Sequence, residues 1–185
     1  METKFPRGAG GFIKPEFVIK EFGILLEMKI ADFGCGHGYF SIPLAKAAGD
    51  NGIVYAIDIQ NSALGAVRSM AKKEGLLNIK YIKGDLEKEK GSRLPDDSMD
   101  LVLLANILYQ SPGKSEILKE ATRVLKKQGS LIMVDWSEDS FVGPPRRTRI
   151  SRETAKRLAE SEGFRIIREF SAGEYHYGLT MAKLT

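Results

Sequence analysis

Cysteine, histidine and long apolar runs are scarce in this sequence, and each scarcity excludes a class of protein. The 185 residues include one cysteine and two histidines, which excludes an internal disulfide and leaves no spacing typical of a metal site. No apolar run approaches the roughly 20 residues that span a bilayer, and the first residues lack the apolar core of a signal peptide. We therefore expect a cytoplasmic protein that binds neither a metal nor a membrane.

A strong excess of one charge is also missing. The chain has 28 Lys and Arg against 24 Asp and Glu, a net charge of +4. The excess lies in residues 146–185, which hold nine basic and five acidic side chains. A basic stretch of this kind is typical of an anion or nucleic-acid surface, and equally of a solvated helix face. Composition leaves both interpretations open.

Composition and length predict a single folded domain over residues 1–185. With 43% hydrophobic residues, a chain of this length buries enough surface to fold without a disulfide or a metal. We expect a flexible tail over residues 1–14. The longest break in the apolar pattern, at residues 137–150, contains Gly143-Pro144-Pro145 and predicts a mobile loop.

Short β-rich runs alternate with helical patterns along the chain, which predicts a doubly wound α/β fold with a mainly parallel sheet. The expected helices cover residues 15–27, 39–48, 62–74, 115–126 and 151–162, the last with Ser151 as its N-cap. The seven expected strands cover residues 29–33, 53–57, 79–83, 101–105, 130–135, 164–170 and 175–184. Only four residues separate the last two strands, so they are expected to form an antiparallel C-terminal hairpin.

A glycine-rich segment, Asp32-Phe33-Gly34-Cys35-Gly36-His37-Gly38, follows the first expected strand. Glycines between a strand and a helix let a ligand lie directly against the backbone, or simply permit a tight turn. Asp58 ends the next strand, twenty positions after Gly38. A carboxylate there can accept hydrogen bonds from both hydroxyls of a ribose. Together these features predict a nucleoside-containing cofactor.

The spacing of the glycines distinguishes between cofactors. The dinucleotide fingerprint G-x-G-x-x-G fails because Tyr39 occupies the third glycine position after Gly34 and Gly36. The pattern is G-x-G-x-G, with Asp32 two residues before it. This segment resembles the first motif of the class I S-adenosylmethionine-dependent methyltransferases, whose sheet is Rossmann-like. In view of this resemblance, Asp32 either caps the loop or meets the cationic amino group or sulfonium of the cofactor.

Four further segments resemble that family's later motifs in the same order. They are Val54-Tyr55-Ala56-Ile57-Asp58, Gly84-Asp85-Leu86, the run from Asp100 to Asn106, and the run from Arg123 to Leu131. The resemblance spans about residues 28–136. It implies S-adenosyl-L-methionine as the cofactor.

The resemblance also implies individual roles. Asp58 would bind the ribose hydroxyls, and Ile59 would pack on the adenine. The Asp85 side chain and the Leu86 amide would meet the adenine edge, and Asn106 would border the transferable methyl group. The residues expected to bind the cofactor are Asp32, Gly34, Cys35, Gly36, Gly38, Asp58, Ile59, Asp85, Leu86 and Asn106.

The sequence identifies no catalytic base. Methyl transfer from a sulfonium is an in-line displacement, and a base is needed only when the nucleophile arrives protonated. His37 and Tyr109 are candidates, whereas His176, inside a strand, is expected to be a hydrogen-bonded structural residue. Phe12, Tyr109 and Trp136 either shape an acceptor pocket or pack in the core.

We expect a methyltransferase similar to quinone-biosynthesis C-methyltransferases that acts on a small molecule. The alternatives are an RNA or protein acceptor, a non-catalytic cofactor-binding module and, least favoured, a dehydrogenase. Cys35 is expected to be an apolar filler rather than a nucleophile. The oligomeric state is left open.

Overall fold

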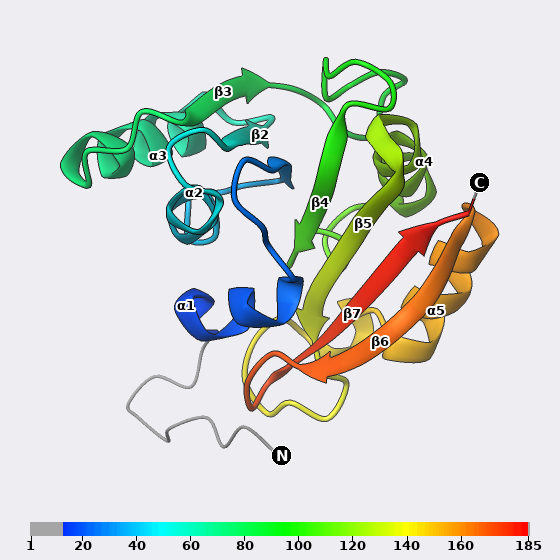
Figure 1. Ribbon diagram of the computed structural model, residues 1–185. Coiled ribbons are helices and arrows are strands. Elements are labelled where there is room, and N and C mark those ends of the chain that lie inside the picture. The colour runs from blue at the N-terminus through cyan, green and yellow to red at the C-terminus, as the bar shows by residue number, and fades with distance from the viewer. Residues whose placement is uncertain (1–12, 185) are drawn as a thin grey trace.

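A computed structural model describes residues 13–184 as one seven-stranded sheet between two layers of helices (Figure 1). The strand order is β3-β2-β1-β4-β5-β7-β6, and β7 runs antiparallel to both of its neighbours. The strands are β1 (Lys29–Phe33), β2 (Ile53–Asp58), β3 (Ile79–Lys83), β4 (Met99–Ala105), β5 (Leu125–Trp136), β6 (Phe164–Ser171) and β7 (His176–Lys183). The predicted fold class, mainly parallel with an antiparallel C-terminal hairpin, is confirmed.

Helices cover both faces of the sheet. One face packs against α1 (Pro15–Val18), the 3₁₀ turn η1 (Ile19–Phe22), α2 (Ser41–Ala48) and α3 (Asn61–Lys73). The other face packs against α4 (Lys114–Val124) and α5 (Arg152–Ser161), while the short turn η2 (Arg146–Thr148) lies in a loop. Within residues 13–184, no helix has the length and apolarity to cross a membrane.

The inner strands β1 and β4 are mostly buried on both faces, where helices cover the sheet. In β1, Ile30 packs into the layer beneath α1 and α2, and its neighbour Ala31 packs into the layer beneath α4. Both residues have no exposed surface. This near-continuous burial is typical of the inner strands of parallel sheets, whereas the edge strands β3 and β6 carry exposed polar side chains.

The chain reverses its direction across the sheet between β1 and β4. From β1 it proceeds outward to β2 and β3, then returns to β4 on the other side of β1. The loops that leave β1 and β4 therefore diverge, which opens a crevice at the carboxyl ends of these strands. The glycine-rich segment follows β1, and Asn106 follows β4.

The prediction of a helix over residues 15–27 was wrong beyond Phe22. Gly23 takes a left-handed conformation with φ of 65° and ends η1. The apolar side chains that extended the helical pattern, Leu25 and Leu26, are 66% and 73% exposed. The helical spacing of these apolar residues therefore does not correspond to a buried face of a helix.

The boundary between α4 and β5 also differs from the prediction. The helix ends at Val124 rather than residue 126, and β5 begins at Leu125 rather than residue 130. Leu125 pairs with Met99, whereas Ser130 pairs with Leu101, so residues 126–129 form a bulge beside β4. β5 therefore follows α4 directly, without a separate turn between them.

One arginine side chain ties together the loop of residues 137–150. The Arg149 guanidinium donates hydrogen bonds to the carbonyl oxygens of Ser137, Ser140, Val142 and Pro144 at 2.6 to 3.0 Å. The mobility expected of this loop remains a prediction, and these bonds oppose it. Residues 1–12 of the expected tail lie outside the described residues, and Ile13 is 4% exposed.

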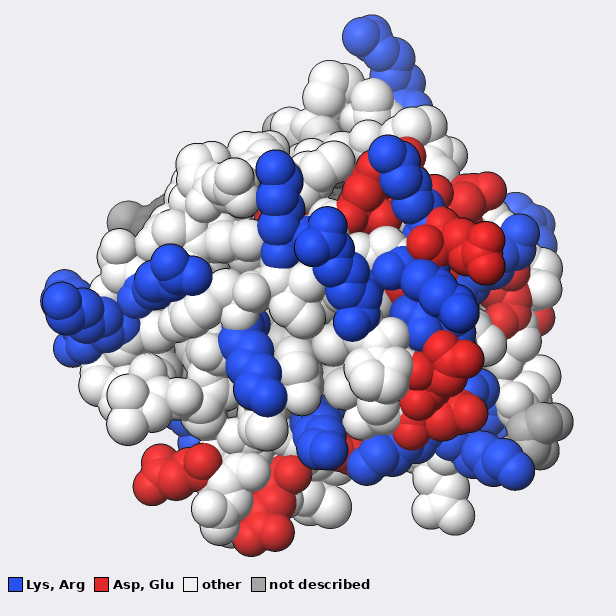
Figure 2. All heavy atoms as spheres, turned by 90° about the horizontal axis from the view of Figure 1, so that it is seen from above, with Lys and Arg blue, Asp and Glu red and all other residues white. Residues whose placement is uncertain are grey.

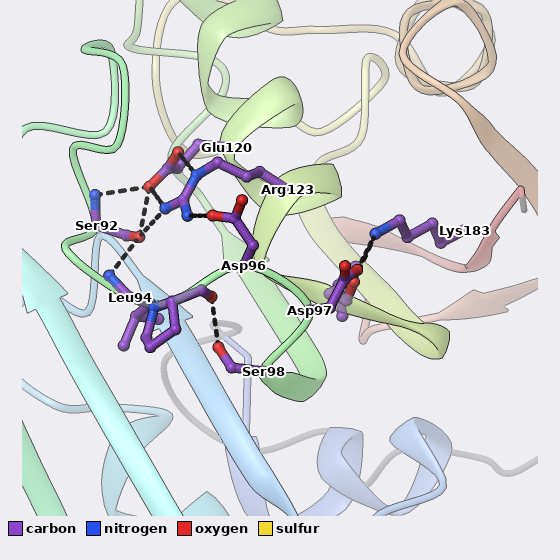
Figure 3. A network of polar contacts seen from close by, with 10 residues as sticks. Ser92, Leu94, Asp96, Asp97, Ser98, Glu120, Arg123 and Lys183 are labelled. Atoms are coloured by element: carbon purple, nitrogen blue, oxygen red, sulfur yellow. Dashed lines mark hydrogen bonds and ion pairs between the residues drawn. The ribbon is translucent and has the colours of Figure 1, made fainter.

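A polar network fastens the loop before β4 to α4 (Figure 3). Glu120, only 4% exposed, accepts hydrogen bonds from Arg123 Nη2 at 2.7 Å and Nε at 2.9 Å. It also accepts from the backbone N–H of Ser92 at 2.9 Å, and Arg123 pairs with Asp96. The Arg123 guanidinium thus compensates the charge of the Glu120 carboxylate at a buried position, where an unpaired carboxylate would be costly.

We expect Arg123→Met to lower the free energy of unfolding by about 3 kcal/mol, because it leaves the buried Glu120 carboxylate without its cation. Urea denaturation measures the change, and Glu120→Gln added to this variant should recover part of the loss. Lys46→Met is the control, because its partner Glu74 is exposed and solvent screens the pair. A loss no larger than that of the control would contradict this account.

Candidate active site

Two cavities lie side by side at the crevice beyond β1 and β4. The first has a volume of about 430 Å³ and the second of about 410 Å³. Gly34, Gly36, His37 and Gln110 line both, so the glycine-rich loop forms the boundary between them. The two cavities therefore form one site with two lobes.

The predicted cofactor residues are distributed between these lobes. Asp58, Ile59, Asp85 and Leu86 line the first cavity, whereas Asp32, Cys35 and Asn106 line the second. The structure thus brings together nine of the ten predicted residues. Gly38 lines neither cavity, and the cofactor role of each residue remains a prediction.

The glycines of the loop serve different purposes. Gly36 has a φ of +51°, and a Cβ built there meets no atom within 4 Å because it points into open space. A flat ligand can therefore lie against this backbone. Gly38 has a φ of +88°, and its Cβ would lie 3.1 Å from the Val67 side chain. Gly38 is thus required for packing against α3.

Asp58 holds the loop in position. One carboxylate oxygen accepts a hydrogen bond from the Gly36 N–H at 3.0 Å, and the other accepts from the Gln60 N–H at 2.9 Å. Each oxygen keeps a further lone pair for a ligand in the first cavity. The arrangement fits a group that carries two adjacent hydroxyls, such as a ribose.

Asp32 lies in the second cavity at the end of β1 and is 2% exposed. Ser41 donates a hydrogen bond to its carboxylate at 2.6 Å. Burial raises the pKa of Asp32 to about 7, opposed by the Ser41 hydrogen bond and assisted by the charge of Asp58. A cationic group bound beside it would stabilise the ionised carboxylate.

The outer wall of the first cavity carries the residues expected around an adenine. Ile59 is 57% exposed at the rim, and Leu86 is 6% exposed. The Asp85 carboxylate accepts a hydrogen bond from the Glu87 N–H at 3.2 Å and pairs with the exposed Lys88 at 3.4 Å. A solvated pair of this kind costs little to rearrange.

The candidate reactive side chains differ in whether they line the cavities. His37 is exposed and lines both cavities, but Tyr109 lines neither. Cys35 is 7% exposed, and burial raises the pKa of its thiol well above the usual range, which makes it unreactive. Trp136 lines the second cavity, while Phe12 lies outside the described residues.

The sequence analysis missed two contributors. Gln110 lines both cavities, although no residue pattern singles it out. His176 was expected to be hydrogen-bonded within its strand. Instead it lines the second cavity, and within the described chain neither of its ring nitrogens has a hydrogen-bond partner. Only the pairing of β7 with β5 brings it there.

Comparisons with known proteins agree on one family. A family model described as a methyltransferase domain matches residues 26–175. A demethylmenaquinone methyltransferase of Geobacillus sp. (strain WCH70) is 29% identical over 128 residues, 69% of this chain and 53% of that protein. One of Staphylococcus aureus is 33% identical over 126 residues, 67% and 49% of the two chains. The chain spans about half the length of these curated relatives.

A solved structure covers more of the molecule. The crystal structure of a SAM dependent methyltransferase from Aquifex aeolicus is similar with a TM-score of 0.85 and 30% identity, over 93% of this chain and 90% of that one. The chain belongs to the class I S-adenosylmethionine-dependent methyltransferases. S-adenosylmethionine is accordingly its cofactor, and the open space at Gly36 and the carboxylate of Asp58 fit its nucleoside.

Cofactor affinity should rise with pH between 6 and 8. Below about pH 7 the Asp32 carboxyl is largely protonated, so a cationic amino group that binds beside it, as predicted, must expel a proton. Affinity for S-adenosylhomocysteine should therefore increase by up to about tenfold per pH unit below that pKa and level off above it. Calorimetric titration at pH 6, 7 and 8, in two buffers of different ionisation enthalpy, measures affinity and proton release together.

Asp32→Asn is the matched control. It keeps the shape and a hydrogen-bonding side chain but cannot titrate. We expect weaker binding whose pH dependence is reduced. An unchanged pH slope in this variant would assign the linkage to another group.

Proposed function

We propose that the protein transfers a methyl group from S-adenosylmethionine to a small molecule bound in the second cavity. The observation that carries this proposal is the junction of the two cavities at the loop of Gly34, Gly36 and His37. With the nucleoside in the first cavity, the methionine end reaches the second beside Asp32 and Asn106. The acceptor and the methyl group then share one cavity.

The bound cofactor supplies a methyl group on a sulfonium, which is already an activated leaving group. The chain's own contribution is to align the partners, and alignment can supply up to roughly 7–11 kcal/mol of a barrier. In this proposal Asp58 fixes the ribose and Asp32 balances the cationic end. The buried walls of the second cavity, including Trp136 at 8% exposed, exclude water from the reacting atoms.

The curated relatives support a small acceptor. Their names describe demethylmenaquinone methyltransferases, so the acceptor named for these relatives carries a quinone ring. We infer that the acceptor here is likewise a small molecule that carries a ring. The acceptor of this chain remains part of the proposal because the match covers only about half of each relative.

The basic C-terminal stretch, residues 146–185, was a reason to consider a nucleic-acid acceptor, and the structure gives this reason less support. The cations of this stretch are largely engaged within the molecule. Arg152 and Lys156 pair with Glu169, and Arg168 pairs with Glu21. Figure 2 views the molecule from the end where β4 and β5 begin, and there acidic side chains lie among the Lys and Arg on the right. Asn106 and Trp136 lie at the opposite ends of these strands.

The first test is calorimetric titration with S-adenosylmethionine, S-adenosylhomocysteine and NADH. We expect binding of the first two and not of NADH. Asp58→Ala should weaken cofactor binding about 10- to 100-fold. The substitution removes the carboxylate that accepts hydrogen bonds from the ribose, and it leaves the Gly36 N–H without its partner. Transfer of labelled methyl from S-adenosylmethionine to a panel of ring compounds then tests the reaction itself.

Asp50→Ala is the matched control, since Asp50 is an exposed acid in the turn before β2. Its affinity should equal that of the unmodified protein. Unchanged affinity in the Asp58 variant would show that the nucleoside binds elsewhere. Cofactor binding without methyl transfer to any compound would favour a non-catalytic cofactor-binding module.

A further inference from the structure

The second cavity has apolar walls and a few polar positions. Ile13, Tyr39, Phe40 and Trp136 supply apolar and aromatic surface. Tyr39 donates its hydroxyl hydrogen bond to the Ile13 carbonyl at 3.0 Å, so that hydroxyl is already engaged. The described residues that line this cavity include no Lys or Arg. An anionic acceptor would therefore meet the Asp32 carboxyl without a compensating lysine or arginine.

Unpartnered polar atoms gather at this cavity. Within residues 13–184, five buried side-chain nitrogen or oxygen atoms have no hydrogen-bond partner. Three of them belong to lining residues: Oδ1 of Asn106 and both ring nitrogens of His176. Asn106 also has a φ of 55°, a conformation that costs energy outside glycine and is common at binding sites. Buried polar groups normally have partners, so these are the atoms that a polar ligand in this cavity would satisfy.

His176 is held rigidly at the cavity. It is the first residue of β7, is 3% exposed, and pairs across the sheet with Trp136. The two rings pack with centroids 4.0 Å apart at an angle of 40°. Gly143 backs the indole, because a Cβ there would lie 2.5 Å from the Trp136 ring. The imidazole therefore has little freedom to find another partner.

The charge state of the imidazole suits a neutral hydroxyl group. Burial lowers the pKa of His176 to about 4, assisted by the positive charge of Arg149. At neutral pH one ring nitrogen donates a hydrogen bond and the other accepts one. A hydroxyl group can use either nitrogen, whereas an ether oxygen can only accept.

We propose that His176 is an acceptor-binding residue, whose imidazole accepts a hydrogen bond from the hydroxyl of a small, uncharged aromatic ring seated beside Trp136. This inference rests on the proposed function, because it needs the second cavity to hold the acceptor. It names the class of acceptor as phenolic or enolic and neutral. Asn106, which lines the same cavity, offers its unpartnered Oδ1 to a second polar group on such a ring.

The test compares two fluorescent probes that differ in one hydrogen-bond donor. 1-Naphthol carries the hydroxyl, and 1-methoxynaphthalene replaces its hydrogen with a methyl group. Fluorescence titration of the protein saturated with S-adenosylhomocysteine should give about fivefold tighter binding of 1-naphthol, the ratio expected for one hydrogen bond. In His176→Phe, which keeps a ring beside Trp136, the two affinities should become equal. A preference that survives in this variant would overturn the proposal.

A second measurement needs no variant at His176. The chain has two histidines, so imidazole ¹⁵N spectra contain two sets of signals, and His37→Asn assigns them. 1-Naphthol should shift the signal of the unprotonated His176 nitrogen, which accepts the hydrogen bond, and 1-methoxynaphthalene should leave that signal unchanged. Equal shifts with both probes, or shifts confined to His37, would mean that a water or another residue satisfies the imidazole.

The outcomes separate the two proposals. If the unmodified protein fails to bind S-adenosylhomocysteine, the proposed function fails. If it binds the cofactor and methylates a ring compound, but the hydroxyl preference does not depend on His176, only the further inference fails. If His176→Phe does not fold, as judged by loss of S-adenosylhomocysteine binding, the ¹⁵N comparison decides.

Discussion

A single carboxylate connects the two strands on which the site depends. Asp58, at the end of β2, accepts the hydrogen bond of the Gly36 amide from the loop that follows β1. The amides of Gly34 and Cys35 also bond to the carbonyl oxygen of Ile57, at 2.8 and 3.0 Å. The loop is therefore shaped by β2 before any ligand arrives. Such preorganisation spares binding the cost of ordering the loop.

The loop so fixed separates two environments. On one side lie Asp58 and Asp85, partly exposed and able to meet the polar edges of a nucleoside. On the other side lie buried Asp32, Asn106 and His176 among aromatic rings. Electrostatic interactions are stronger on the buried side because water is largely excluded there. The polarity of the site thus falls from the first cavity to the second.

Local signals predicted residues that the structure places together at the first cavity, namely Asp58, Ile59, Asp85 and Leu86. The glycine spacing and the strand-end acids concern residues that are close in sequence or separated by one helix, so the motifs place them at one edge. The helix expected over residues 15–27 failed because the exposure of Leu25 and Leu26 is a tertiary property that periodicity cannot report. The role of Arg149 could not be predicted either. Its side chain binds backbone carbonyl oxygens, which every residue has, so no residue pattern indicates these contacts.

His176 shows why the second half could not be predicted. Its position depends on the register that sets it opposite Trp136, forty residues earlier in the chain. A shift of one residue would turn Tyr177 toward the cavity and His176 toward α5, because side chains alternate along a strand. No local pattern around His176 specifies that register.

The reversed direction of β7 has a consequence for how the protein can change over time. Its amino end lies beside the carboxyl ends of β4 and β5, so the last hairpin adds a wall to a pocket whose glycine-rich loop and Asp58 lie more than a hundred residues upstream. Substitutions in the hairpin can change the lining of the second cavity while the glycine-rich loop and Asp58 stay unchanged. During evolution, one half of the pocket can therefore change through substitutions in a short C-terminal segment, without any change in the residues that form the other half.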